Sequence, residues 1–300
     1  MTPRFTAEAE TDLRSLLRLR LPDWRRSTLR RRLALGLVLL NGEAVFRDDV
    51  RLAPGSEVRI LPRPEEGAGF FLPGPGRPPL AVLYADSALL AVDKPAGLLS
   101  VASDREKRLT AIRLLREWLA GPGREDDRTL HSAHRLDRDA SGVLLFARGL
   151  EIRRRLAAAW PGFEKIYLAV VDGVPPRPEG DIDLPLRQDR GLFVRPATGG
   201  DGKPSRTRYR LRERRGGRSL LEIRLDTGRK HQIRAHLAHI GCPVAGDRRY
   251  GGSRAPRLLL HAAELRLIHP LDGRELAIRS ELPGVFRRPG SPLPEAEFGV

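Results

Sequence analysis

A run of proline and glycine at residues 62–79 divides this chain of 300 residues into two parts. Proline stiffens a backbone, glycine loosens it, and neither supplies apolar surface for a core, so the run predicts a linker. A small domain then covers residues 1–61 and a larger domain covers residues 80–288. The tail at residues 289–300 is again rich in proline, and we expect it to be disordered.

The charge of the chain points to a polyanionic partner. Lysine and arginine exceed the acidic residues by 16, and such an excess speeds association with RNA, DNA or anionic membranes. No apolar run could span a bilayer and no signal pattern opens the chain, so we expect no membrane partner. Cys242 is the one cysteine, which excludes an internal disulfide framework and multi-cysteine zinc sites. We expect a reduced, cytoplasmic monomer.

The small domain reads as an α/β unit. Leu13, Leu16 and Leu17 have helical spacing, and Ser27 is a plausible N-cap for a second helix. Apolar residues at 37–40 read as a strand that enters an Asn-Gly hairpin turn, because both turn residues tolerate positive φ. A later strand follows at residues 58–61. Five arginines lie around the second helix, namely Arg25, Arg26, Arg30, Arg31 and Arg32, and such a charge run is often only a solvated face.

The larger domain shows more strands than helices. Helical patterns fit residues 107–119 and 230–240. Strand patterns occur at residues 89–92, 142–147, 166–171, 209–212, 220–225 and 258–261. Hairpin turns are frequent between them. We therefore expect an α+β fold with a mixed, mostly antiparallel sheet and helices packed on it.

One segment combines polar chemistry with a rigid support. Residues 131–148 run from a charged loop containing Asp137 straight into an apolar strand, and a carboxylate on rigid backbone suits catalysis. A solvated turn is the alternative. A calcium loop beginning at Asp137 is excluded because its twelfth position, which should be Glu, is Arg148.

A second segment concentrates positive charge where a helix begins. Arg229, Lys230 and His231 follow Gly228 at a predicted strand-to-helix junction, where the helix dipole disfavours cations. An anion is therefore expected there, either RNA phosphate or a carboxylate from elsewhere in the chain. Phosphate-loop, zinc-deaminase and nucleophile-elbow patterns are all incomplete, so we expect neither a cofactor nor a metal.

Together these segments resemble the RluA-type family of RNA pseudouridine synthases. The resemblance spans roughly residues 80–285 and preserves the family order of five motifs, at residues 85–97, 134–137, 164–170, 227–244 and 257–270. Two departures are Ala140 where the family usually has Thr, which could shift Asp137 slightly, and Ala133 for a common Val. Residues 11–61 resemble the S4-like RNA-binding domain often fused to this family.

The resemblance implies a role for each matched residue. Asp137 would attack C1′ or deprotonate C2′ of the target nucleotide, a choice that stays open, and Arg229 would keep its carboxylate ionised. Tyr167 would stack on the uracil, although a core tyrosine is the plainer alternative. Arg135 would fill the gap that the flipped base leaves. Further contacts to substrate or RNA are expected from His134, Leu260, Lys230, Arg25, Arg26, Arg30 and Arg31.

The resemblance also implies the substrate. We expect isomerisation of uridine to pseudouridine in structured RNA, and the S4-like domain favours large-subunit (23S) ribosomal RNA. Transfer RNA is the alternative within the same chemistry. A non-catalytic RNA-binding protein of ribosome assembly is the alternative outside it. DNA is not an expected partner, because the sequence shows no recognition helix of the kind found in dimeric DNA-binding proteins.

Overall fold

The computed structural model describes residues 3–25, 28–29, 32–33, 37–45, 48–60, 80–103, 106–107, 109–120, 129–189, 191, 193–197 and 200–286. The predicted linker, the predicted tail and three predicted RNA contacts (Arg26, Arg30 and Arg31) lie outside these residues. The predictions made for them therefore stay predictions.

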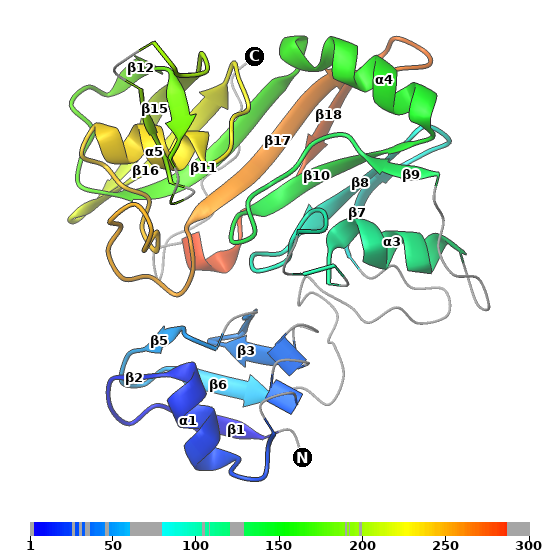
Figure 1. Cartoon of the computed structure of the whole chain (residues 1–300). Helices are drawn as coiled ribbons and strands as arrows, with labels where there is room; N and C mark the ends of the chain where they lie inside the picture. The colour runs from blue at the N-terminus through cyan, green and yellow to red at the C-terminus, as the bar shows by residue number, and fades with distance from the viewer. Residues whose placement is uncertain are drawn as a thin grey trace.

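The N-terminal domain is a small sheet with a helix against it (Figure 1). Its strand order is β1 (Arg4–Thr6), β6 (Glu57–Ile60), β3 (Val38–Leu40), β4 (Glu43–Ala44), and β2 (Thr11–Asp12) pairs with β5 (Arg51–Leu52). Helix α1 (Leu13–Arg20) begins at Asp12, whose side chain accepts a hydrogen bond from the backbone N–H of Ser15. The predicted turn is confirmed, since Asn41 and Gly42 both have positive φ.

The larger domain is built on a ten-stranded sheet. Eight strands follow in the spatial order β12 (Glu179–Asp183), β15 (Arg206–Arg215), β16 (Arg218–Leu225), β11 (Glu164–Asp172), β17 (Leu260–Ile268), β10 (Ser141–Arg148), β8 (Leu89–Lys94) and β7 (Val82–Ala85). In addition β18 (Glu275–Arg279) pairs with β17 and β9 (Leu130–Ser132) pairs with β10, while β13 (Leu186–Gln188) and β14 (Val194–Pro196) form a separate hairpin. Antiparallel pairs dominate, so the predicted α+β class is confirmed.

Three helices cover this sheet. Leu114 and Leu115 of α3 (Ala111–Ala120) pack on one face of β8 and β10, while α4 (Leu150–Ala159), which the sequence pattern did not predict, packs on the other face (Figure 1). Helix α5 (Gln232–His239) lies on the same side as α3 and packs against β11 and β16. Short 3-10 turns follow α4 (Trp160–Gly162) and close the described chain (Gly284–Phe286). None of the described helices is long and apolar enough to cross a membrane.

Among the described strands of the large sheet, the one parallel pairing lies where the loop that carries Asp137 leads into β10. Ser141 pairs with His261 and Gly142 with Ala262. Gly142 has a φ of +109°, and a Cβ on it would lie 2.2 Å from the carbonyl oxygen of Ala262. Only glycine permits so close an approach. The loop that carries Asp137 is thereby fixed against the first residues of β17.

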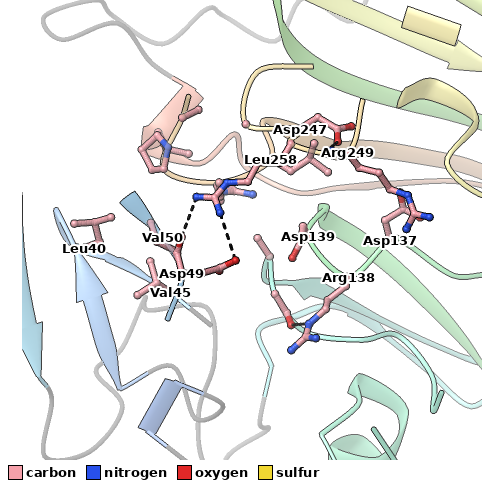
Figure 2. Close-up of a pocket in the computed structure, with 18 of the residues that line it drawn as sticks. Leu40, Val45, Asp49, Val50, Asp137, Arg138, Asp139, Asp247, Arg249 and Leu258 are labelled. Atoms are coloured by element: carbon pink, nitrogen blue, oxygen red, sulfur yellow. Dashed lines mark hydrogen bonds and ion pairs between the residues drawn. The ribbon is translucent and has the colours of Figure 1, made fainter. Parts of the chain in front are cut away.

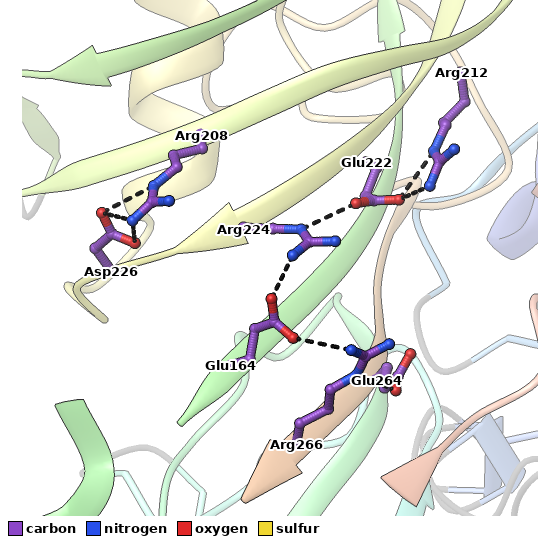
Figure 3. A network of polar contacts seen from close by, with 8 residues as sticks. All are labelled: Glu164, Arg208, Arg212, Glu222, Arg224, Asp226, Glu264 and Arg266. Carbon is purple, nitrogen blue, oxygen red and sulfur yellow. Dashed lines mark hydrogen bonds and ion pairs between the residues drawn. The ribbon is translucent and has the colours of Figure 1, made fainter. Parts of the chain in front are cut away.

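Ion pairs link neighbouring strands on the face of the sheet that is opposite to Tyr167 (Figure 3). Glu222 pairs across the strands with Leu168, so its side chain lies on the face away from Tyr167. Carboxylates on β16, β11 and β17 alternate with arginines there: Arg208 with Asp226, Arg212 and Arg224 with Glu222, Arg224 and Arg266 with Glu164, and Arg266 with Glu264. The four arginines in these pairs are therefore neutralised by carboxylates on the same face.

Candidate active site

Asp137 lies in a loop that buried polar groups hold in place. The amine of Lys94, which is fully buried, donates hydrogen bonds to the carbonyls of Leu98 (2.9 Å) and Arg138 (3.2 Å). Ser100 exchanges two hydrogen bonds of 3.0 Å with the backbone of Leu136. Burial lowers the pKa of Lys94 to about 7, although nearby carboxylates oppose the shift. The residues on both sides of Asp137 are thus fixed from β8 and the loop after it.

Arg234 is the cation that pairs with Asp137. Its Nη1 lies 3.1 Å from Asp137 Oδ2, while its Nε and Nη2 donate to the two oxygens of Asp247 at 2.6 and 2.8 Å. Asp247 is 2% exposed. Burial opposes the charge of Arg234, but the hydrogen bonds and charges of the two carboxylates outweigh it and raise the pKa of Arg234. One guanidinium therefore connects the candidate catalytic carboxylate to a buried anchor.

The expected pairing of Asp137 with Arg229 is wrong. Arg229 precedes the first residue of α5, its side chain is exposed, and its Nε donates to the carbonyl of Pro204 at 3.3 Å. Arg234 lies in the first turn of α5, in a stretch that is buried from Gln232 to Leu237. The sequence did contain a signal for it. Arg234 adjoins Ile233 of the apolar stripe, and a buried arginine requires an acidic partner. A carboxylate from elsewhere in the chain was expected beside these cations. It is that of Asp137, and it pairs with Arg234 instead of Arg229.

His231 stands beside this pair in a strained conformation. Its φ of 52° is left-handed, a region that a non-glycine residue rarely adopts. Nε2 lies 3.9 Å from Asp137 Oδ2, and Nδ1 lies 3.1 Å from the hydroxyl of Tyr250. Burial lowers the pKa of His231 to about 4, against the attraction of Asp137, so the imidazole is neutral at neutral pH. The sequence pattern placed His231 beside Arg229 and Lys230 but predicted no role for it.

Tyr167 and Leu260 lie on neighbouring strands in the same region. Tyr167 on β11 pairs with Ala262 of β17, the residue that Gly142 also contacts. Leu260 is 4% exposed and packs in the same cluster as Tyr167. Burial raises the pKa of Tyr167, and the charge of Asp137 adds to this effect. The structure thus brings both predicted residues to the strands beside the Asp137 loop.

The other predicted contacts divide into exposed and enclosed side chains. Arg135, Lys230 and Arg25 are exposed and accessible to RNA. His134 is not oriented as expected for an RNA contact. Its Nε2 accepts the backbone N–H of Leu145 at 3.0 Å, and its ring stacks on Trp160 at 4.8 Å. Burial lowers the pKa of His134 to about 3. His134 therefore holds the start of the Asp137 loop against β10.

A pocket of about 870 Å³ opens above Asp137, between the two domains (Figure 2). Its lining includes Asp137, Asp139, His231, Arg234 and Asp247 from the larger domain, with Leu258 on its wall rather than the predicted Leu260. Leu40, Asn41, Gly42, Val45, Asp49 and Val50 line it from the N-terminal domain. The structure thus places the two domains on either side of one pocket.

The arrangement suits a reaction that needs one ionised carboxylate in a basic, partly enclosed site. Asp247 is engaged by Arg234, which leaves Asp137 facing the pocket with a cation on one oxygen. No group of three or more His, Cys, Asp or Glu side chains placed to hold a metal occurs in the described part of the chain.

Comparison with known proteins agrees with this chemistry. The sequence profile described as RNA pseudouridylate synthase matches residues 88–239. An uncharacterized RNA pseudouridine synthase of Chloroflexus aurantiacus is 46% identical over 156 residues, which cover 50% of this chain and 49% of that protein.

Longer similarities include the N-terminal domain. Ribosomal large subunit pseudouridine synthase D of Xanthomonas campestris is 33% identical over 91% of this chain and 86% of its own length. Ribosomal large subunit pseudouridine synthase C of Salmonella typhimurium is 33% identical over 94% of this chain and 92% of its own length.

Solved structures share the fold. Human RNA pseudouridylate synthase domain containing 4 superimposes with a TM-score of 0.56 at 24% identity, over 69% of this chain and 90% of that one. Taken with the profile match and the near full-length relatives, this makes the chain a member of the RluA-type family of RNA pseudouridine synthases.

Proposed function

We propose that this pseudouridine synthase modifies uridines of large-subunit ribosomal RNA, with Asp137 as its catalytic residue. The observation that carries the catalytic assignment is the ion pair between Asp137 and Arg234 at the bottom of the shared pocket. Support for the substrate comes from relatives that resemble both domains and are named ribosomal large subunit synthases.

The reaction breaks the bond between N1 and C1′, turns the uracil, and joins C5 to C1′, while C5 loses its proton and N1 gains one. Asp137 would attack C1′ or remove a proton from C2′, and either role needs an ionised carboxylate. Arg234 supplies the neighbouring positive charge that favours this form. A hydrolytic glycosidase uses two carboxylates because it must activate water. Here the base is retained and reattached, so one carboxylate is sufficient.

The target nucleotide must leave its stack before it can reach Asp137. Tyr167 would stack on the extruded uracil, with Leu260 supporting it from β17. Arg135 is exposed two residues before Asp137, and its planar guanidinium would take the place of the base in the RNA. Arg229 and Lys230, both exposed, would contact phosphates.

The N-terminal domain would add an S4-like anchor for RNA. Arg25 is exposed, and together with Arg26, Arg30 and Arg31 it would bind phosphates outside the active site. Transfer RNA is the alternative substrate. A non-catalytic role in ribosome assembly is disfavoured by an intact Asp137, Tyr167 and paired arginine.

The deciding experiment measures tritium release from C5-labelled uridine in two transcripts, a large-subunit ribosomal RNA and a mixed transfer RNA pool. Release from the ribosomal transcript alone is expected. Release from transfer RNA alone would refute the substrate, and release from neither, with binding retained, would favour the assembly role. Mapping pseudouridines in a deletion strain then identifies the positions.

A further inference from the structure

The segment between α5 and β17 carries four arginines at the mouth of the pocket. Arg248, Arg249 and Arg257 line the pocket above Asp137, and Arg254 lines a smaller adjoining cavity of about 330 Å³ together with Arg248. Two of the four are held within the larger domain: Arg257 donates to Ser141 Oγ at 2.9 Å, and Arg249 donates to the carbonyl of Gly191 at 3.2 Å.

The other two arginines bind acidic residues of the N-terminal domain. Arg248 donates to the carbonyl of Asp49 at 2.9 Å and pairs with its carboxylate at 3.4 Å (Figure 2). Arg254 pairs with the carboxylate of Glu10. These contacts join the two domains on one side of the opening that leads to Asp137.

Both cross-domain pairs are exposed to solvent. The side chains of Arg248 and Asp49 are 56% and 42% exposed, and those of Arg254 and Glu10 are 54% and 55% exposed. Exposed ion pairs contribute little to stability and are screened by salt. A guanidinium binds phosphate with the same forked geometry that it uses for carboxylate. A dense row of RNA phosphates can therefore displace the two carboxylates.

We propose that Arg248 and Arg254 form a phosphodiester-binding pair at the mouth of the active-site cleft, which Asp49 and Glu10 occupy while no RNA is bound. RNA takes their place, and the N-terminal domain moves away from the opening. This inference rests on RNA being the substrate and does not depend on which RNA is modified. The arginine pair then has two states, one that closes the cleft and one that holds the RNA backbone.

The first test measures the position of the N-terminal domain without measuring turnover. Fluorescent dyes are attached to Leu19→Cys and Leu271→Cys, which replace exposed residues, while Cys242 is 2% exposed and should not react. Energy transfer should fall when a short stem-loop RNA is added to the full-length protein. It should already be low without RNA in the variant Asp49→Ala/Glu10→Ala. Unchanged transfer in that variant would overturn the closed state.

The same variant should bind the stem-loop about threefold to tenfold more tightly. In the wild type only part of the protein is in the open state, whereas in the variant nearly all of it is open. Removing two carboxylates also raises the net charge, so a matched control is needed. Asp201→Ala/Glu117→Ala removes two acidic partners of exposed ion pairs within the larger domain and changes the net charge equally. An equal gain in the control would show a general charge effect and overturn the proposal.

The second test concerns the arginines themselves. Arg248→Gln/Arg254→Gln should also lower energy transfer without RNA, but it should weaken RNA binding. The salt dependence should become shallower by roughly 0.7–0.9 for each lost phosphate contact. An unchanged slope would refute the phosphate-binding role. Binding and energy transfer require no isomerisation, so failed tritium release with these results intact would refute the proposed function and leave this inference standing.

Discussion

Asp247 should be a determinant of both stability and turnover, although it does not contact the substrate in the proposed reaction. Asp247→Asn keeps the shape of the side chain but places an amide where a carboxylate oxygen now accepts from Arg234. Asp247 is 2% exposed and holds Arg234 by hydrogen bonds of 2.6 and 2.8 Å. Its Oδ1 also accepts the backbone N–H groups of Arg249 and Tyr250.

Removing one partner of a buried ion pair costs about 3–5 kcal/mol. Because asparagine retains one acceptor and Asp137 still neutralises Arg234, we expect the lower end, about 3 kcal/mol. For a domain of this size, each kcal/mol lowers the melting temperature by about 2–4 °C. Thermal unfolding should therefore shift downward by about 6–12 °C. With its anchor weakened, Arg234 should hold Asp137 less firmly, and tritium release should slow at least about tenfold.

Asp226→Asn is the matched control for this measurement. Asp226 also binds an arginine through both oxygens, but its partner Arg208 is 53% exposed and Asp226 itself is 31% exposed. An exposed pair contributes about 0–1 kcal/mol, so this variant should unfold almost as the wild type does. Equal destabilisation of the two variants, or a loss below about 1 kcal/mol for Asp247→Asn, would refute the argument from burial.

Three further predictions concern groups near Asp137. Asp137→Asn should lose at least about a thousandfold in tritium release, or about 4 kcal/mol of transition-state stabilisation, while RNA binding persists; near-normal turnover would remove Asp137 from the mechanism. Lys94 has a pKa lowered to about 7 in the folded protein, so the unfolded chain binds more protons between pH 7 and its ordinary pKa of 10.5. Over that interval the wild type should gain up to about 1.4 kcal/mol of stability per pH unit relative to Lys94→Met in denaturant titrations, and equal pH slopes would contradict the shift. The imidazole of His231, with a pKa lowered to about 4 by burial, should stay neutral by NMR from pH 8 down to pH 5, and protonation near pH 6.5 would contradict its enclosure.

The sequence predicted most strands of the large sheet and the location of the loop that carries Asp137, because both depend on local patterns. Alternating apolar residues marked β16, and the junction between a charged loop and an apolar strand marked Asp137 and β10. Helix α4 was missed because its sequence, with three consecutive arginines at residues 153–155, leaves only Ile152 and Leu156 buried. So weak an apolar stripe carries little periodic signal.

The partner of Asp137 could not be chosen by charge alone. The motif contains two cations before α5, Arg229 and Lys230, and Arg234 within it, and the identity of the paired arginine depends on where the helix begins. Helix boundaries are the least certain feature of a sequence pattern. The contact between the domains was also beyond prediction, because Asp49 and Arg248 are almost two hundred positions apart in the chain.

The position of β17 has a consequence for how the enzyme is made. This strand lies between β11 and β10, so until residues 260–268 have left the ribosome the sheet exists as two separate pieces. Pairings between distant segments are slow to form because a long loop must close first. From the time β11 has been made until β17 follows, a nascent chain should therefore expose the unpaired edge of β11 that β17 later covers, and such an edge invites wrong pairing. The loop that carries Asp137 and the strand that carries Tyr167 are joined through β17, so the candidate site can assemble only after residues 260–268 have been made.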